Sequence, residues 1–264
     1  MEKKMIPITL NGRKLEVRED QMVLQVAREH GVDIPTLCYH EALGIHGGCR
    51  LCIVEAESPA LRKGLMASCT LQVSPGMIVE TNSPEVTRAR KVIFELFLGR
   101  ASESESLREM AAKYGVTASR FTTDSSEDCV RCGLCVRVCR EQIGVAALCF
   151  TGRGQKKRVS AEFGQLSQTC IGCGTCANLC PTGAIQMEDV DGWRRIFVGD
   201  NTISRQPLIP CRQCGTPFQT AKFADYVRTK SDIEGATEIP RDLCSACARS
   251  TSAVAAIGES LAFR

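Results

Sequence analysis

The sequence predicts an α+β protein made of several small domains that are organised around cysteines. One cysteine pattern occurs twice, in residues 129–139 and 170–180, and each cysteine of the first copy recurs 41 residues later. Hairpin and helix signals precede a separate group of four cysteines near the N-terminus, and two C-x2-C pairs lie near the C-terminus. The 264 residues have room for two or more domains, and we place the domains at 1–82, 83–127, 128–205 and 206–264.

The doubled pattern has the spacing C-x2-C-x2-C-x3-C, which bacterial two-cluster ferredoxins use to hold two 4Fe–4S clusters. Three thiolates at this spacing surround one cube, and the fourth binds the other cube. Eight cysteines in two matching runs argue against a disulfide framework or paired zinc sites. Residues 128–205 are therefore predicted to be a bacterial-type two-4Fe–4S ferredoxin domain with crossed ligand sets: Cys129, Cys132, Cys135 and Cys180 for one cluster, and Cys170, Cys173, Cys176 and Cys139 for the other.

Composition restricts where such a protein works. The 17 cysteines are an odd number, which fits poorly with full disulfide pairing, and the N-terminal residues have only a short apolar run, so no secretory signal is predicted. Reduced, metal-bound thiolates in the cytoplasm are the better interpretation. No apolar run of the sequence approaches the roughly 18 residues of a membrane span. The net charge of +3 is too small to indicate nucleic-acid binding.

The first 82 residues are predicted to form a β-grasp ferredoxin domain with a 2Fe–2S cluster. Two strand-like segments flank Asn11-Gly12, which favours a tight hairpin turn. Asp20 is placed to cap a helix over residues 22–30, and Gly31 is placed to end it. Four cysteines with the spacing C-x10-C-x2-C-x16-C then supply two thiolates for each iron: Cys38, Cys49, Cys52 and Cys69.

Other candidate ligands are left out of these sets. His40 and His46 lie beside the first four cysteines, but four thiolates already fill that shell, so both are predicted to be loop residues. Cys149 lies in an apolar run outside every motif and is predicted to be a buried thiol that behaves as a hydrophobic side chain.

Short motifs around the cysteines resemble a known family. The segments DIPTLCYH (33–40), GCRLC (48–52), CVRVCR (135–140) and FTGRG (150–154) are similar to the large iron–sulfur subunit of respiratory complex I and to the diaphorase iron–sulfur subunit of NAD-linked hydrogenases. Iron hydrogenases and NAD-linked formate dehydrogenases begin with the same kind of domain. The resemblance implies an electron relay between an NAD(P)H-oxidising flavoprotein and a terminal subunit of the hydrogenase or formate dehydrogenase type.

One part of the family pattern is missing. Most such relatives hold another 4Fe–4S cluster between the two domains, with one histidine and three cysteines, but residues 83–128 contain neither residue type. Helices are predicted over 84–98 and over 102–114, the second capped by Ser104 and ended by Gly115. The segment is therefore predicted to be a helical connector that holds the domains together by packing alone. The sequence leaves open whether electrons pass directly between the domains.

Residues 206–264 are predicted to be a small metal-binding segment with a helix over 220–230. A zinc-ribbon-like site is the first interpretation, because a segment with few apolar residues needs a metal for stability. A further iron–sulfur cluster at a docking surface is the second, and nucleic-acid binding is a third, remote one. The segment also resembles the tail of some ferredoxin-like hydrogenase subunits. Its candidate ligands are Cys211, Cys214, Cys244 and Cys247.

The cysteine motifs are compatible with three functions to different degrees. An electron-transfer subunit of a larger cytoplasmic oxidoreductase, of the hydrogenase, formate dehydrogenase or electron-bifurcating type, is favoured. A free-standing multi-cluster ferredoxin that serves several partners is the alternative, although a diffusing carrier needs only one domain. An enzyme in its own right is disfavoured, because the sequence has no dinucleotide loop, no phosphate-binding loop and no separate cysteine set for a catalytic metal. No catalytic residues are assigned.

Overall fold

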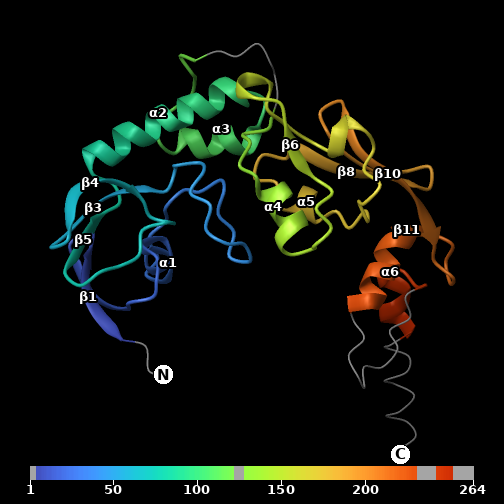
Figure 1. Ribbon diagram of the computed structural model, residues 1–264, viewed down its shortest axis with the longest axis horizontal. Helices are drawn as coiled ribbons and strands as arrows, with labels where there is room; N and C mark the ends of the chain where they lie inside the picture. Colours follow the sequence, from blue (N-terminus) through green and yellow to red (C-terminus); the bar gives the residue numbers. More distant parts are fainter. Residues whose placement is uncertain (1–3, 122–127, 231–241, 252–264) are drawn as a thin grey trace, which may run out of the picture.

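The computed structural model describes residues 4–121, 128–230 and 242–251. The chain follows an arch (Figure 1), in which the N-terminal sheet forms one end, two helices cross the top, and the segments after residue 128 form the other side. Helices are mixed with strands whose pairing is antiparallel except between β1 (Met5–Leu10) and β5 (Met77–Glu80), so the predicted α+β class is confirmed.

The N-terminal domain is a five-stranded sheet of order β2-β1-β5-β3-β4, with one helix packed into its core. Only β1 and β5 are parallel, which is the β-grasp arrangement. The turn between β1 and β2 is formed by Asn11 and Gly12, with φ of 49° and 76°, as the sequence predicts. The elements are β1 (Met5–Leu10), β2 (Arg13–Arg18), α1 (Val23–Glu29), β3 (Ile53–Ser58), β4 (Leu61–Ala67) and β5 (Met77–Glu80).

The start of α1 differs from the prediction. The N-cap is Met22, not Asp20. Residues 19–20 form a turn after β2, and Met22 is extended (φ −85°, ψ 149°) and forms a β-bridge with Gln72 before the helix begins. The other end of the helix is as predicted, because Gly31 adopts a φ of 73°, which is typical of the residue after a helix.

The connector contains two helices, α2 (Pro84–Arg100) and α3 (Glu105–Ala112). The side chains of Ser83 and Ser104 cap them by accepting hydrogen bonds from the backbone N–H groups of Val86 and Leu107, each the third residue of its helix. Both predicted helices and the predicted Ser104 cap are therefore confirmed. The buried faces of the helices share one apolar core with residues from both cysteine-rich domains: Leu37, Cys38, Cys49, Leu51, Phe94, Leu98, Leu107 and Val130.

The remainder contains short helices, a two-stranded ribbon and a four-stranded sheet of order β11-β10-β9-β8. The predicted helix over 220–230 is present as α6, and residues 245–251 are also helical. The boundary predicted at 205/206 falls inside β10, so the C-terminal segment continues the same sheet. The elements are α4 (Leu134–Glu141), β6 (Cys149–Thr151), η1 (Gly154–Lys156), β7 (Arg158–Ser160), η2 (Glu162–Gly164), α5 (Thr175–Asn178), β8 (Ile185–Val190), β9 (Trp193–Val198), β10 (Asn201–Pro210), β11 (Pro217–Thr220) and α6 (Ala221–Lys230).

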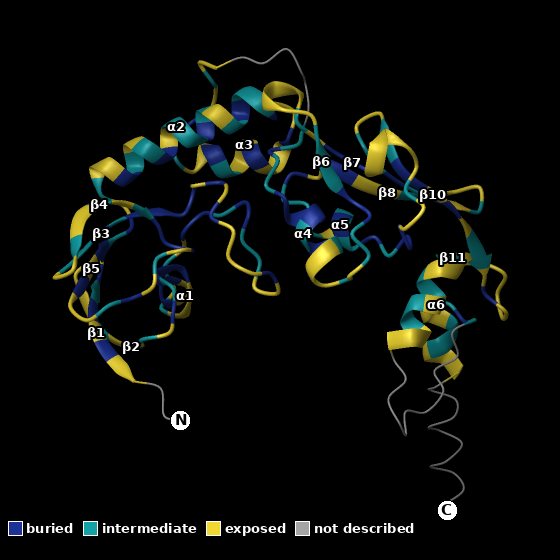
Figure 2. Cartoon of the chain, in the orientation of Figure 1, coloured by how far each residue is buried: buried dark blue, intermediate teal, exposed yellow. Residues whose placement is uncertain are grey.

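Buried residues gather inside the N-terminal sheet, along the inner side of the connector and around α4 and α5 (Figure 2). One core fills the N-terminal domain, a second joins its cysteine loop to the connector, and a third lies between α4, α5 and the sheet. By contrast, α6 has no fully buried residue. Within the ranges that the structure describes, no helix has the length and apolar character needed to cross a bilayer.

Candidate metal centres

The first four cysteines lie where the N-terminal sheet meets the connector, and all four are buried. Their sulfurs form two pairs. The Sγ atoms of Cys52 and Cys69 are 3.3 Å apart, and the Cys49 N–H donates to the sulfur of Cys38 at 3.3 Å. The N–H of Leu37 donates to the sulfur of Cys49 at 3.4 Å. Two pairs of thiols with backbone N–H donors fit a 2Fe–2S cluster, in which each iron takes two thiolates.

Within each pair, one thiol is a stronger acid than the other. Hydrogen bonding between the two side chains lowers the pKa of Cys38 to about 5 and raises the pKa of Cys49. It likewise lowers the pKa of Cys52 to about 6 and raises that of Cys69. Iron that binds both sulfurs of a pair must therefore displace the proton of the weaker acid, Cys49 or Cys69.

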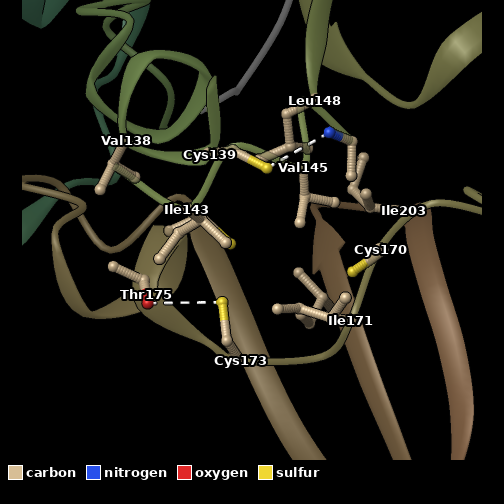
Figure 3. A pocket seen from close by; sticks show the side chains of 13 residues that line it. Val138, Cys139, Ile143, Val145, Leu148, Cys170, Ile171, Cys173, Thr175 and Ile203 are labelled. Carbon is tan, nitrogen blue, oxygen red and sulfur yellow. Dashed lines mark hydrogen bonds between the residues drawn. The ribbon is translucent and has the colours of Figure 1, made fainter. Parts of the chain in front are cut away.

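The eight cysteines of the doubled pattern gather around two cavities. In each cavity three cysteines come from one copy of the pattern and the fourth comes from the other copy. One cavity, seen in Figure 3, is also lined by apolar side chains such as Val138, Ile143 and Leu148, which exclude water. This grouping places the sulfurs where crossed ligand sets need them: Cys170, Cys173, Cys176 and Cys139 in one cavity, and Cys129, Cys132, Cys135 and Cys180 in the other.

Glycines let each ligand loop turn tightly around its cavity. Gly133 and Gly174 are the N-caps of α4 and α5, with φ of 80° and 75°. A side chain at Gly172, whose φ is 72°, would place its Cβ only 2.7 Å from Cγ2 of Thr220. The N–H of Gly172 donates to the sulfur of Cys170 at 3.4 Å. Such N–H donors stabilise negative charge on a cluster and help to set its potential.

Burial also controls the chemistry of these thiols. It raises the pKa of Cys132 and Cys176 to about 12, and it raises the pKa of Cys135 well above the ordinary range. A thiol in such surroundings keeps its proton unless a cation compensates the buried charge. These cysteines therefore suit iron binding better than thiol catalysis, which needs an exposed thiolate.

The C-terminal cysteines are brought together more tightly. All four sulfurs lie within 4.8 Å of one another, and those of Cys214 and Cys244 are 3.8 Å apart. Four thiolates at about 2.3 Å from a single zinc ion form a tetrahedron with edges of about 3.8 Å. In a four-iron cube each thiolate binds a different corner, which separates the sulfurs further. The donor set of Cys211, Cys214, Cys244 and Cys247 thus fits a single ion.

A loop of the N-terminal domain, residues 38–48, docks on α4. Arg137 of α4 donates to the carbonyl of Cys38 at 3.4 Å and to that of Gly44. The same arginine pairs with Glu141 at 3.0 Å, and Glu141 accepts a hydrogen bond from the N–H of Gly44 at 3.4 Å. Leu43 packs against the buried side of α4. The first cysteine set therefore lies beside the dicluster domain, an arrangement that no local sequence pattern indicates.

Other supporting residues were also missed by sequence reasoning. The buried Arg194 donates to the carbonyl of Gly172 at 3.0 Å and forms a double hydrogen bond with Asp189 at 2.7 and 2.8 Å. Gln206 donates to the carbonyl of Cys170 at 2.7 Å. These side chains come from the sheet after the cysteine motifs. The sequence carries no signal for these residues, because what distinguishes Arg194 is its burial, and burial is not visible in the sequence.

Comparisons with known proteins agree with this geometry. A 2Fe-2S iron-sulfur cluster binding domain model matches residues 3–84, and a 4Fe-4S dicluster domain model matches residues 128–184. An NADH-quinone oxidoreductase subunit of Rhizobium meliloti is 30% identical over 260 residues, which cover 87% of this chain and 29% of that protein. The mitochondrial NADH-ubiquinone oxidoreductase 78 kDa subunit of Neurospora crassa is 30% identical over 212 residues, or 68% of this chain and 27% of that protein. The chain thus spans less than a third of these curated relatives.

A solved structure decides the family. A chain in the crystal structure of an NAD+-reducing NiFe-hydrogenase in the H2-reduced state is 30% identical, with a TM-score of 0.57, over 67% of this chain and 85% of that chain. The chain belongs to this family of iron–sulfur subunits. The predicted resemblance is thereby confirmed. The iron–sulfur subunit carries a 2Fe–2S domain and a 4Fe–4S dicluster domain, and its connector has no cysteine or histidine with which to hold a cluster between them.

Proposed function

We propose that the iron–sulfur subunit relays single electrons within a cytoplasmic NAD(P)H-linked oxidoreductase complex. The docking of the 38–48 loop on α4 carries this proposal, because it puts Cys38 and Cys132 into one shared core. The two cavities proposed to hold the 4Fe–4S clusters lie near opposite ends of α4, one beside Cys135 and the other beside Cys139. Three proposed metal sites in succession through packed parts of the chain are what a relay requires.

The proposed cofactors are one 2Fe–2S cluster, two 4Fe–4S clusters and one zinc ion. Each iron–sulfur cluster, when bound, supplies one-electron redox chemistry. The chain contributes the thiolates, the backbone N–H donors that stabilise them and the apolar linings that exclude water. The proposed ligands are Cys38, Cys49, Cys52 and Cys69 for 2Fe–2S, Cys129, Cys132, Cys135 and Cys180 for one 4Fe–4S cluster, Cys170, Cys173, Cys176 and Cys139 for the other, and Cys211, Cys214, Cys244 and Cys247 for zinc.

The proposed partners are a flavoprotein that oxidises NAD(P)H and a terminal subunit of the hydrogenase or formate dehydrogenase type. The names of the relatives support this choice, since a NADH-quinone oxidoreductase and an NAD+-reducing hydrogenase each join a nicotinamide cofactor to a second redox reaction. A nicotinamide cofactor delivers two electrons as a hydride, and a flavin can release them one at a time. Clusters that each carry one electron can then pass them on to the second partner.

Metal analysis combined with EPR of anaerobically purified protein tests the cofactor set. We expect about ten iron atoms per chain, because the assigned clusters contain two, four and four, together with one zinc. About fourteen iron atoms and no zinc would replace the zinc ion with another four-iron cluster. A colourless protein without a reducible EPR signal would overturn the whole proposal.

Size-exclusion chromatography of the native material tests the relay against the free-standing ferredoxin. We expect the subunit to elute together with a flavoprotein, and we expect NADH to reduce its clusters only when that flavoprotein is present. Elution as a single chain that exchanges electrons with several unrelated partners would support the alternative.

A further inference from the structure

Arg90 is a fully buried cation beside the first cysteine set. It lies in the middle of α2, and its side chain has 0% relative exposure. Its Nε donates to the carbonyl of Leu51 at 3.0 Å, and its Nη2 donates to the carbonyl of Ile53 at 2.6 Å. These two residues flank Cys52 on either side. The guanidinium of the connector therefore holds the backbone on both sides of a metal ligand.

Among the described residues, the acceptors that Arg90 contacts directly are not carboxylates. Its Nη1 donates to the amide oxygen of Asn82 at 3.3 Å, and its guanidinium lies 5.5 Å from the centroid of the Tyr114 ring. Across the described parts of the chain, no acidic side chain forms an ion pair with it. Burial lowers the pKa of Arg90, while interactions with Tyr114, Cys52 and Asp33 raise it.

A buried charge without a counter-charge is costly, so a buried arginine is normally paired. Four thiolates around two irons form an anionic group, and Cys52 is one of those thiolates. Two anionic side chains act electrostatically on the Arg90 guanidinium: Cys52, with the larger effect, and Asp33, with a smaller one. Because Cys52 is a proposed cluster ligand, the cluster site is the main source of the compensating negative charge. Arginine suits this place because its planar fork reaches two carbonyls and stays charged when buried.

We propose that Arg90 is the counter-ion of the 2Fe–2S cluster and that its charge raises the reduction potential of that cluster. Reduction adds one negative charge to an already anionic group, and a fixed positive charge nearby stabilises the reduced form more than the oxidised form. Burial keeps salt from screening this interaction. The inference rests on the ligand set in the proposed function and does not depend on the partners.

The test is an EPR-monitored redox titration of the complete, cluster-loaded subunit at low and at high salt. Arg90→Gln removes the charge, Arg90→Lys keeps it but loses the fork, and Lys91→Gln removes an exposed charge from the next position of the same helix. We expect Arg90→Gln to lower the midpoint potential of the 2Fe–2S signal at both salt concentrations. Arg90→Lys should stay near the wild-type potential, and any effect of Lys91→Gln should be smaller and vanish at high salt.

A wild-type potential in Arg90→Gln would overturn the proposal. It would also fail if Arg90→Lys shifted the potential as far as Arg90→Gln, because Arg90 would then act only through its hydrogen bonds. If Arg90→Gln fails to retain the cluster, Arg90→Lys decides: an unchanged potential supports the proposal and a lowered one overturns it. The absence of a 2Fe–2S signal in the wild-type protein would instead overturn the ligand assignment.

Discussion

The position of a cysteine in the fold determines its environment more than its neighbours in the sequence do. Cys139 belongs to the first copy of the pattern, yet it lines the cavity of the second copy, where the N–H of Ala147 donates to its sulfur at 3.2 Å. Cys149 lies ten positions further along in β6 and donates instead to the carbonyl of Ser160 at 3.6 Å. It is half-buried, not fully buried as predicted, because β6 and β7 form a ribbon of only two strands.

Replacing Cys139 tests the crossed ligand sets. We expect Cys139→Ser to disturb the cluster that is proposed to bind Cys170, Cys173 and Cys176, because that cluster would lose its fourth thiolate. Iron content should fall from about ten toward about six atoms per chain, measured by metal analysis together with EPR. Cys149→Ser is the matched control and should keep all the iron. Loss of the other 4Fe–4S signal would show that the sets are not crossed.

The pH dependence of zinc retention follows from the thiols at the C-terminal site. A hydrogen bond from the Cys244 N–H lowers the pKa of Cys211 to about 6, whereas hydrogen bonding with Cys244 raises the pKa of Cys247 to about 12. Zinc must therefore displace the proton of Cys247 at neutral pH, and must also displace that of Cys211 once the pH falls through about 6. Because protons compete with the metal, affinity should decrease as the pH decreases.

A zinc-release assay with a chromogenic chelator, run from about pH 8 to about pH 5, measures this dependence. We expect the released fraction to rise as the pH falls, most steeply in the acidic part of the range. Zinc retention that does not change across the range would contradict this assignment of the ligands.

At the scale of elements, α4 has two roles. Cys135 and Cys139 project from it toward the two cavities, and Arg137 on the same helix binds the 38–48 loop. The helix begins at Gly133, whose left-handed conformation turns the ligand loop into the helix. One helix therefore contributes cysteines to both cavities of the dicluster domain and also binds the loop of the N-terminal domain. This contact joins the two domains without a cluster between them.

Arg137→Ala tests the docking role of α4. The substitution removes the hydrogen bonds to the carbonyls of Cys38 and Gly44, and hydrogen bonds from a charged donor contribute about 1.5–3 kcal/mol each. We expect faster hydrogen exchange at the amides of residues 38–48. The loss of stability in denaturant unfolding should be about 1–3 kcal/mol, less than the sum for two strong bonds because the bond to Cys38 is 3.4 Å long. Arg140→Ala, an exposed change on the same helix, should alter neither measurement. Equal effects of the two substitutions would argue against the docking contact.

At the scale of the whole molecule, the C-terminal segment is built onto the dicluster domain. β10 passes through the predicted boundary and pairs with both β9 and β11. The buried Thr220 donates to the carbonyl of Ile171 at 2.5 Å, and Lys222 donates to that of Gln168 at 2.6 Å. The segment that carries the last four cysteines therefore supports the ligand loop that contains Cys170 and Cys173.

Removing the C-terminal metal site should weaken this support. We expect the double substitution Cys214→Ser and Cys247→Ser to eliminate zinc while fresh anaerobic protein keeps about ten iron atoms. Because β11 and α6 would then be held less firmly against the ligand loop, absorbance should bleach faster in air than in the wild-type protein. Arg249→Ser, an exposed change next to the site, is the control. A loss of four iron atoms together with the zinc would show that this site is a cluster.

The sequence by itself determined the hairpin at Asn11-Gly12 and the helices of the connector, and it supplied the candidate cysteine sets. These features depend on spacing, turn chemistry and capping between residues close together in the chain. Only the tertiary structure decided that residues 38–48 dock on α4, that Arg90 lies beside Cys52, and that the last four sulfurs converge on one point. Each of these contacts joins segments that are far apart in the sequence, and their meeting depends on how the domains pack.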